Sequence, residues 1–280
     1  MKQTTLGKPI TLVGQGLHTG TPSKIRLTPA PAGAGITVQR MVADLHEPER
    51  LTPLKVKNTS SAIHVEVDGR LVKSVEHVLA ALYGMGVDNV NLQVWGEEIP
   101  AMDGSAWPFV KAMAKAKIVP LKTSVEPMRL TQTMGVELDH RYVMAFPARR
   151  LETCVVVDYE HPAIGRQLFH GNISPEVFAG QLAKAKTFGW ASRIKEQRAQ
   201  GLIKGGTASN ALIFGEGGLE NPRMRTYPDE PVRHKTLDLL AALALLGGRF
   251  MAHVVAIRPG HALDVMFVKK VYEMMQGGKA

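Results

Sequence analysis

The sequence predicts an α+β fold with two similar layered domains. Segments that alternate between apolar and polar residues open each half of the chain, which is typical of half-buried strands. Apolar segments at helical spacing follow them in both halves. A polar stretch with prolines at both ends, residues 119–127, favours a linker between the halves. We therefore expect a first domain at residues 1–120 and a second at residues 127–280.

In the first half, residue patterns predict strands at residues 9–13, 24–27, 63–67 and 90–94. Asp68 and Gly69 favour a tight hairpin turn after the third of these strands. Helices are expected at residues 75–84 and 107–117. The first should end at its glycines, because glycine is favoured just past a helix end.

In the second half, strands are expected at residues 136–138, 142–145, 153–157, 211–214 and 251–257. A helix should begin after Ser174, since proline follows in its first turn. Another is expected at residues 192–200. A long helix should run from a cap at Asp229 or a neighbour to about Leu246, and a last helix should follow from His261 onward.

Composition limits the classes of function. The chain has 280 residues, 45% of them hydrophobic, and a formal net charge of +9, which favours anionic partners. Its basic residues form no long run, so we expect a phosphorylated small molecule as partner and no nucleic acid. The single cysteine, Cys154, cannot form an internal disulfide, and the apolar stretch 237–246 is too short to cross a bilayer. We expect a cytoplasmic monomer, with peripheral membrane contact left open.

His234 and Asp238 are the first candidates for chemistry. They lie four residues apart in a predicted helix, so their side chains share one helix face and could ligate one small cation. A pair of this kind is also common on a solvated surface. The apolar residues that follow favour the first interpretation, because a partly buried helix face rarely holds an unpaired carboxylate.

Glu76 and His77 begin another apolar helix and point in different directions. That arrangement suits a metal ligand with a neighbouring base. Two imidazoles and one carboxylate, with a fourth position for water, form a catalytic zinc arrangement. The alternative is that His77 is a helix-start residue bonded to backbone. His261, after a buried strand, could be a general acid or a loop residue, and Thr187, in a turn, could donate to an oxyanion or be structural.

Several ordered motifs resemble those of the UDP-3-O-acyl-N-acetylglucosamine deacetylase family, zinc enzymes of lipid A synthesis in Gram-negative bacteria. The resemblance runs nearly from end to end. Its motifs are Gly16-Leu17-His18-Thr19-Gly20, Ser74-Val75-Glu76-His77, Glu98 to Ala106, His161-Pro162-Ala163-Ile164, Lys186-Thr187-Phe188-Gly189, Val232 to Asp238, and Gly260-His261-Ala262-Leu263.

The resemblance implies that each domain is a layered βα sandwich and that the active site lies between them. It implies His77, His234 and Asp238 as ligands of Zn²⁺, although Fe²⁺ suits the same ligands. Glu76 would be the general base, Thr187 would stabilise the oxyanion, and His261 would protonate the leaving amine.

The resemblance also assigns substrate contacts. Lys235 and Arg258 would lie near the nucleotide diphosphate of an acylated UDP-N-acetylglucosamine. An insert in the second domain, about residues 188–213, would form a passage for the acyl chain. Its expected walls are Phe188, Ile194, Ile203, Gly206 and Ala211, for which ordinary core packing is the alternative.

Two departures from the family pattern suggest altered activity. Ala242 stands where the family carries an aspartate paired with the general-acid histidine, and loss of such a partner typically costs about 10–100-fold in activity or metal affinity. Residues 57–62 are mostly small and polar where the family has larger apolar residues. Besides the acylated substrate, the sequence therefore leaves open a paralogue that deacetylates a different N-acetyl sugar, and a weakly active nucleotide-sugar-binding protein.

Overall fold

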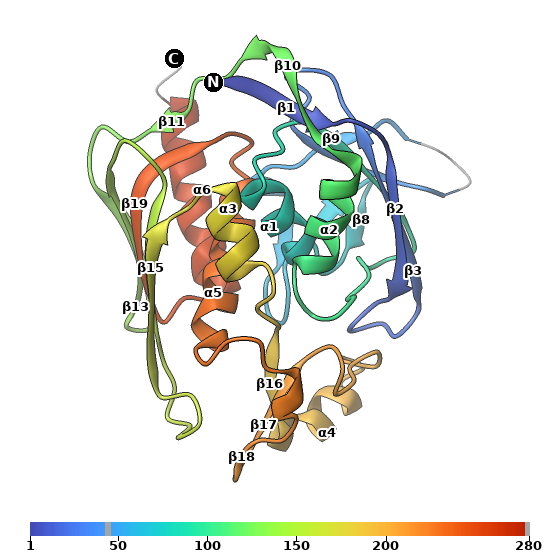
Figure 1. Cartoon of the computed structure of the whole chain (residues 1–280), viewed down its shortest axis with the longest axis vertical. Helices are drawn as coiled ribbons and strands as arrows, with labels where there is room; N and C mark the ends of the chain where they lie inside the picture. The colour runs from blue at the N-terminus through green and yellow to red at the C-terminus, as the bar shows by residue number, and fades with distance from the viewer. Residues whose placement is uncertain (43–45, 278–280) are drawn as a thin grey trace.

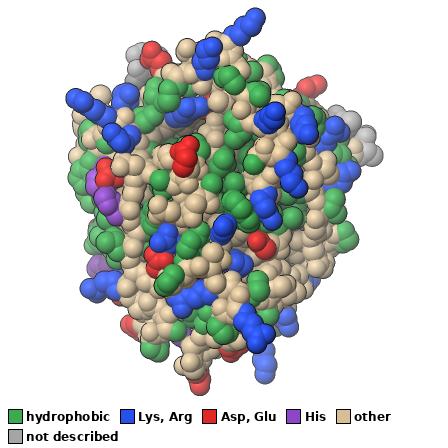
Figure 2. All heavy atoms as spheres, viewed as in Figure 1, with side chains coloured by type: hydrophobic (Ala, Val, Ile, Leu, Met, Phe, Trp, Pro, Cys, Tyr) green, Lys and Arg blue, Asp and Glu red, His purple; other side chains and the backbone are tan. Residues whose placement is uncertain are grey.

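Two large sheets face each other across a central group of helices (Figure 1). The computed structural model describes residues 1–42 and 46–277, so the last three residues of the second predicted domain lie outside it. The fold is α+β, as the sequence predicts. Figure 2 shows Lys and Arg side chains distributed over one whole face, in line with a charge of +9 that no single run carries.

The first large sheet has the spatial order β2 (Ile10–Gln15), β3 (Pro22–Pro29), β9 (Val90–Trp95), β4 (Ile36–Arg40), β5 (Glu49–Arg50). The pair β4–β9 is parallel, and the other neighbours are antiparallel. In β3, Ser23, Ile25 and Leu27 face the core and alternate with exposed residues. This is the pattern expected of a sheet with one buried face.

The second large sheet repeats this topology. Its order is β12 (Met134–Leu138), β13 (Arg141–Pro147), β19 (Phe250–Ile257), β14 (Glu152–Asp158), β15 (Arg166–Asn172), and β11 (Met128–Arg129) also pairs with β19. Here β14–β19 is the parallel pair, and β12–β13, β13–β19 and β14–β15 are antiparallel. In each large sheet, the strand that comes last in the sequence, β9 or β19, lies at the centre. The prediction of two similar topologies is confirmed.

Six α-helices lie in the part of the chain that the structure describes. They are α1 (Glu76–Gly84), α2 (Trp107–Ala116), α3 (Pro175–Val177), α4 (Ala191–Ala199), α5 (Glu230–Ala244) and α6 (His261–Gly277). Short helical turns occur at η1 (Pro53–Lys55), η2 (Phe178–Leu182) and η3 (Pro222–Met224). None of the described helices is both long and apolar enough to span a membrane.

The central helices α1 and α5 pack along each other. On α5 every residue from Thr236 to Ala244 is buried. Gly84 ends α1, and a Cβ there would lie 2.3 Å from the Phe178 ring, so the close approach requires glycine. This packing brings the start of α1 beside the start of α5.

Three smaller sheets complete the fold. One contains β6 (Val56–Asn58), β7 (His64–Val67) and β8 (Arg70–Val72); another contains β16 (Phe188–Trp190), β17 (Leu212–Gly215) and β18 (Gly218–Leu219); the third pairs β1 (Lys2–Leu6) with β10 (Ile118–Ser124). The predicted turn between β7 and β8 is confirmed, since Asp68 and Gly69 have φ values of 54° and 67°.

One local prediction is wrong. The proposed linker at residues 119–127 is mostly strand β10, which pairs with β1 through Thr4↔Pro120 and Leu6↔Ile118. The strand pairing satisfies backbone groups that a linker would leave to water. Asp229 occupies the N-cap position of α5, as expected, although its carboxylate makes no capping hydrogen bond and accepts instead from Arg233 Nε at 2.6 Å.

Candidate metal and active site

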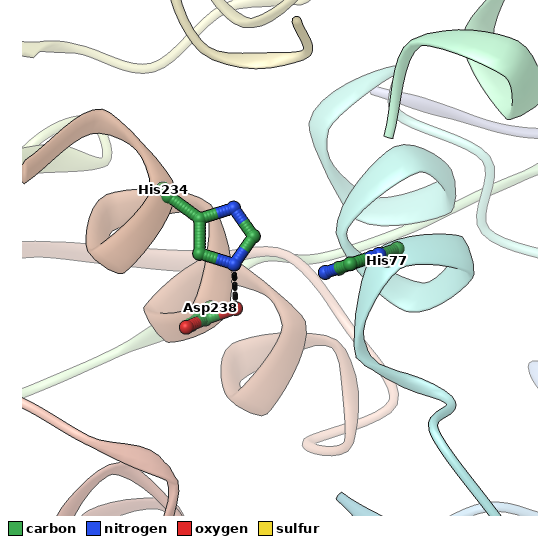
Figure 3. A group of neighbouring side chains, drawn as sticks. All are labelled: His77, His234 and Asp238. Atoms are coloured by element: carbon green, nitrogen blue, oxygen red, sulfur yellow. Dashed lines mark ion pairs between the residues drawn. The ribbon is translucent and has the colours of Figure 1, made fainter. Parts of the chain in front are cut away.

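Three potential metal ligands meet where α1 and α5 begin. His77 comes from the first turn of α1, and His234 and Asp238, one turn apart, come from the first half or so of α5 (Figure 3). One ligand atom of each lies within 4.8 Å of the others. The His77 and His234 rings are 5.2 Å apart, and His234 Nε2 lies 3.5 Å from Asp238 Oδ1. The helix packing therefore brings together the three residues that the sequence proposed as ligands.

The donor set fits a divalent cation. His234 Nδ1 donates to the Ala185 carbonyl at 3.0 Å, which leaves Nε2 with a lone pair directed toward Asp238. Asp238 is fully buried, and its Oδ1 has no hydrogen-bond partner among the described residues. A buried carboxylate oxygen without a hydrogen-bond partner destabilises the fold unless another group binds it. A cation bound by these atoms would do so.

The protonation states also suit metal binding. Burial lowers the pKa of His77 to about 3 and lowers the pKa of His234, so both imidazoles are neutral near pH 7. Burial alone would raise the pKa of Asp238. The Lys235 ammonium, 2.8 Å from Asp238 Oδ2, and the neighbouring histidines together outweigh burial and hold that pKa well below its usual range. Two neutral imidazoles and one ionised carboxylate are the forms that ligate zinc.

Glu76 lies beside these residues but is not part of the ligand group. Its Oε2 accepts from the Ile63 N–H at 2.9 Å, and its side chain lines the same cavity. Burial, with a smaller contribution from Asp238, raises the pKa of Glu76 to about 8. A carboxylate with a raised pKa is a good proton acceptor near neutral pH.

His261 and Thr187 lie in the same cavity. His261 begins α6, its Nε2 is 4.0 Å from Asp238 Oδ2, and burial lowers its pKa to about 4. Thr187 is held through its backbone, where its N–H donates to Gly104 at 2.8 Å. A Cβ on Gly104 would lie 1.9 Å from the Asn210 carbonyl, so this close packing depends on glycine.

The cavity above the cluster has a volume of about 1180 Å³. It extends beneath the sheet of β16 and β17 and helix α4, which project at the lower end of the molecule in Figure 1. All five expected passage residues line it: Phe188, Ile194, Ile203, Gly206 and Ala211. The polar residues 57–61 line it as well, so the departure noted in the sequence borders this cavity.

The two predicted diphosphate contacts lie in different places. Lys235 lines the cavity, but its ammonium is bound to Asp238 and lies 5.7 Å from the centre of the Phe188 ring. Arg258 is not among the cavity-lining residues. Its guanidinium donates to Asp158 Oδ2 at 3.0 Å, on a half-exposed surface. The structure therefore does not bring Arg258 to the other candidates.

Several cavity residues were not singled out from the sequence. They include Leu17, His18, Arg141, Tyr159 and Lys269. Leu17 and His18 belong to the Gly16–Gly20 motif, whose turn wraps the buried Glu98 carboxylate through N–H bonds from His18 at 2.9 Å and Thr19 at 2.8 Å. The motif was a usable signal for these two residues. Arg141, Tyr159 and Lys269 come from segments with no motif of their own.

The surroundings of His261 lack the carboxylate that the family pattern supplies. Ala242 is fully buried one turn after Asp238, and His261 Nδ1 has no hydrogen-bond partner within the described chain. Asp264, three residues after His261, is also buried, and neither of its carboxylate oxygens has a hydrogen-bond partner among the described residues. Burial, with a smaller contribution from the charge of Asp238, raises its pKa well above the usual value.

The fold and the site together define a class. An α+β protein with neutral imidazoles, an ionised carboxylate and a separate high-pKa carboxylate in one deep cavity has the side chains of a metal-assisted hydrolase. Comparison with known proteins agrees. The LpxC family, described as UDP-3-O-acyl N-acetylglycosamine deacetylase, matches residues 3–273, and the chain belongs to this family.

Individual relatives support the same assignment. The chain is 38% identical to the UDP-3-O-acyl-N-acetylglucosamine deacetylase of Solibacter usitatus (strain Ellin6076), over 96% of this chain and 90% of the relative. The deacetylase of that name from Thermosynechococcus vestitus (strain NIES-2133 / IAM M-273 / BP-1) is also 38% identical, over 96% and 93%. The one from Anaeromyxobacter sp. (strain Fw109-5) is 37% identical, over 96% and 88%.

Proposed function

We propose that this chain is a zinc-dependent deacetylase that hydrolyses the N-acetyl group of a UDP-3-O-acyl-N-acetylglucosamine in lipid A biosynthesis, giving acetate and the free amine. The observation that carries the proposal is the group of His77 and the buried His234 and Asp238, with Glu76 beside it, at one cavity with the expected passage residues. The names of the relatives supply the substrate. The free Cys154 fits a reducing compartment, so we place the reaction in the cytoplasm.

The proposed ligands are His77, His234 and Asp238. Zinc held there would polarise the amide carbonyl and lower the pKa of a water molecule to about 7. Glu76, held by the Ile63 N–H, would accept the proton of the attacking water. Imidazole and carboxylate ligands suit Fe²⁺ as well, so the native metal is a matter for measurement.

The later steps are assigned to groups that line the cavity. Thr187 would donate its hydroxyl to the oxyanion that forms when water adds to the amide carbon. His261 would deliver a proton to the leaving amine, and its protonated form would be favoured by the charge of Asp238, 4.0 Å away. The cations Lys57, Arg141 and Lys269, which also line the cavity, would attract the diphosphate.

A second candidate function rests on the polar residues 57–61 at the cavity wall. Small polar side chains bind an acyl chain less well than large apolar ones, because they offer less apolar surface to bury. The alternative is therefore a paralogue that deacetylates an N-acetyl sugar without an acyl chain. Ala242 favours a third candidate, a weakly active nucleotide-sugar-binding protein.

Turnover of matched UDP-sugars tests these candidates. Zinc-loaded protein should release acetate from the 3-O-acylated UDP-N-acetylglucosamine and at least about tenfold more slowly from the unacylated sugar, since the apolar passage would contribute binding only with the acyl chain. Equal rates on both sugars would favour the paralogue. Binding of either sugar without acetate release, at full zinc occupancy, would support the binding protein.

A further inference from the structure

The outer face of the second large sheet carries a group of side chains that the proposed reaction does not use. On β14, buried residues alternate with half-buried ones, and Glu152 and Cys154 belong to the half-buried set. His253 on β19 likewise lies between two buried residues, and His170 on β15 is exposed next to the buried Phe169. Since α5 packs against β14 and β15 from the buried side, this face points away from the His77–His234–Asp238 cavity.

Strand register brings three of these side chains together. Glu152 and His253 are direct partners in the parallel pair of β14 and β19. His170 is opposite Cys154 in the antiparallel pair of β14 and β15, two residues from Glu152. Partners in register project from the same face of a sheet. In Figure 2, histidine and acidic side chains adjoin at the left edge, on the side where β13 and β15 lie in Figure 1.

The distances place the three side chains within reach of one cation. His170 Nε2 lies 2.6 Å from Glu152 Oε1, and the His170 and His253 rings are 6.2 Å apart. One ligand atom from each of the three residues lies within 4.8 Å of the others. Ligand atoms around a tetrahedral zinc ion lie roughly 3.4 Å apart. The His170 side chain is 55% exposed and can close the remaining gap by rotation.

One atom of the group has no partner. His253 Nε2 is buried and forms no hydrogen bond within the described residues, while the His253 ring lies 6.2 Å from that of Phe146. A buried polar atom left unpaired costs about 1–3 kcal/mol, so such atoms usually have a protein, water or ion partner. A cation that His253 ligates through Nε2 would satisfy it.

We propose that Glu152, His170 and His253 form a second metal site, which binds a divalent transition-metal ion of the zinc class. Two imidazoles and one carboxylate are a ligand set for zinc, cobalt and nickel. A bound ion would connect β14, β15 and β19 and thereby stabilise the edge of the sheet. The site lies outside the catalytic cavity, so its occupancy should not change turnover.

Metal titration of the full chain tests this proposal with Zn²⁺ and with Co²⁺ as probes. Every protein should carry Cys154→Ser, so that binding to the nearby thiol is not counted. Glu152→Gln, His170→Ala and His253→Ala each remove one ligand from a different strand. The matched control is His140→Asn, which changes an exposed histidine 4.0 Å from Glu137 that has no third ligand in the described residues.

The parent and the control should bind one equivalent more than each ligand variant. Loss of an outer-shell partner already costs about 10–100-fold in metal affinity, so loss of a ligand should weaken the second equivalent by about 100-fold or more. Zinc should raise the melting temperature of the parent above that of the ligand variants. Equal stoichiometry and equal zinc-induced melting shifts in parent and ligand variants would overturn the proposal. The test compares the number of metal ions bound by the parent with the number bound by each variant. The difference does not depend on whether the catalytic site holds metal, because that site is the same in all of them.

Discussion

At the scale of single residues, burial prepares the candidate metal ligands. The same desolvation that would penalise a charge keeps His77 and His234 neutral, and neutral imidazole is the form that ligates. Lys235, 2.8 Å away, is the largest of the contributions that lower the pKa of Asp238 and keep it ionised. Lys235 thus stabilises the charge of a candidate metal ligand. The sequence did not suggest this role, because a Lys–Asp spacing of three residues also fits an ion pair on an exposed helix face.

One prediction at this scale concerns Ala242. Ala242→Asp should raise kcat about tenfold, because a carboxylate one turn after Asp238 would orient His261 and favour its protonated form. Steady-state acetate release from zinc-loaded protein is the measurement. Ala242→Asn, of equal size and no charge, is the control. Equal kcat in the parent and the folded aspartate variant would show that His261 needs no such partner.

At the scale of elements, the turn of residues 16–20 is held by one buried acid. Glu98 accepts from the N–H groups of His18 and Thr19 and from the Ser74 hydroxyl at 2.7 Å. A Cβ on Gly16 would lie 2.3 Å from Glu98 Oε2, which explains the glycine. In this way the turn places His18 at the cavity and is linked, through Glu98, to Ser74, two residues before α1.

Stability should depend on pH through Glu98. Burial alone would raise its pKa, but the N–H and hydroxyl donors lower it below the usual value. The stabilisation is therefore fully present above the unfolded-state pKa of about 4.3 and is lost as pH falls through the lower folded-state pKa. Glu98→Gln should reduce the free energy of unfolding by about 2 kcal/mol at pH 7.

Urea unfolding across pH 3 to 7 measures this effect. The difference between parent and Glu98→Gln should shrink below about pH 4, where the parent glutamate becomes protonated. Glu97→Gln, the exposed neighbour paired with Lys73 at 3.2 Å, should stay within about 0.5 kcal/mol of the parent. A gap between Glu98→Gln and parent that is constant with pH would show that charge is not the cause.

Elements set by local signals could be predicted from the sequence. The hairpin at Asp68 and Gly69 and the ends of α1 and α5 depend on neighbouring residues, and the structure has them as expected. Strand β10 could not be predicted, because its partner β1 is over 100 residues away. Strand β15 also escaped, since only Phe169 among its residues is buried and the segment has no clear alternation.

Prediction of the site follows the same division. The spacing of His234 and Asp238 pointed to one helix face, and the structure places both on it. Spacing alone could not join them to His77, because that depends on the packing of α1 along α5. The sequence could not show the surroundings of Arg258 for a similar reason: its contact with Asp158 depends on how the end of β19 lies beside β14.

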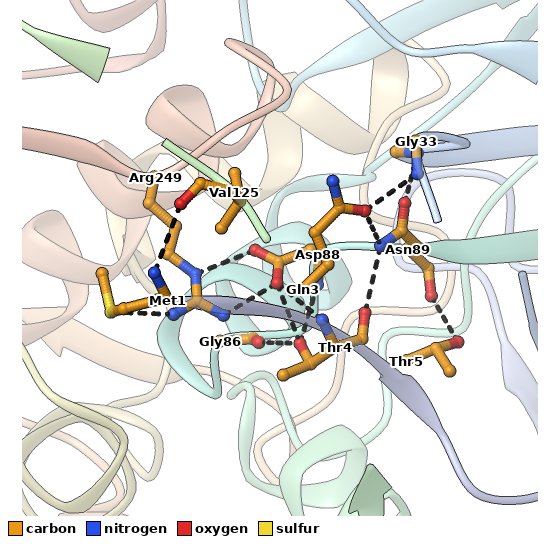
Figure 4. A network of polar contacts seen from close by, with 11 residues as sticks. Met1, Gln3, Thr4, Thr5, Gly33, Gly86, Asp88, Asn89, Val125 and Arg249 are labelled. Carbon is orange, nitrogen blue, oxygen red and sulfur yellow. Dashed lines mark hydrogen bonds and ion pairs between the residues drawn. The ribbon is translucent and has the colours of Figure 1, made fainter. Parts of the chain in front are cut away.

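At the scale of the whole molecule, the two large sheets share one strand order, and a polar network joins the units that carry them. Arg249, just before β19, donates to both oxygens of Asp88, just before β9, at 2.9 and 2.7 Å (Figure 4). Asp88 also accepts from the Thr4 N–H at 2.8 Å. The proposed site draws its residues from both units, so this connection bears on its geometry.

Breaking the connection should weaken the fold as a whole. Arg249→Ala should lower the free energy of unfolding by about 1–3 kcal/mol, because a partly buried carboxylate loses a bidentate partner. Urea unfolding at fixed zinc concentration measures it. Arg166→Ala, which removes an exposed partner of Asp158, should cost less than about 1 kcal/mol. If the two variants lose the same free energy of unfolding, the Arg249–Asp88 pair contributes no more to stability than an exposed ion pair.

The central claim is that Glu76 acts as base beside a metal held by His77, His234 and Asp238. Zinc content and acetate release, measured together on Glu76→Gln protein, test it most directly. Glutamine can still accept from the Ile63 N–H, so the fold and one catalytic zinc per chain should persist while kcat falls about 10²–10⁴-fold. Parent-like turnover of the zinc-loaded variant would contradict the role of Glu76, and zinc bound equally well after His77→Ala, His234→Ala or Asp238→Ala would contradict the site.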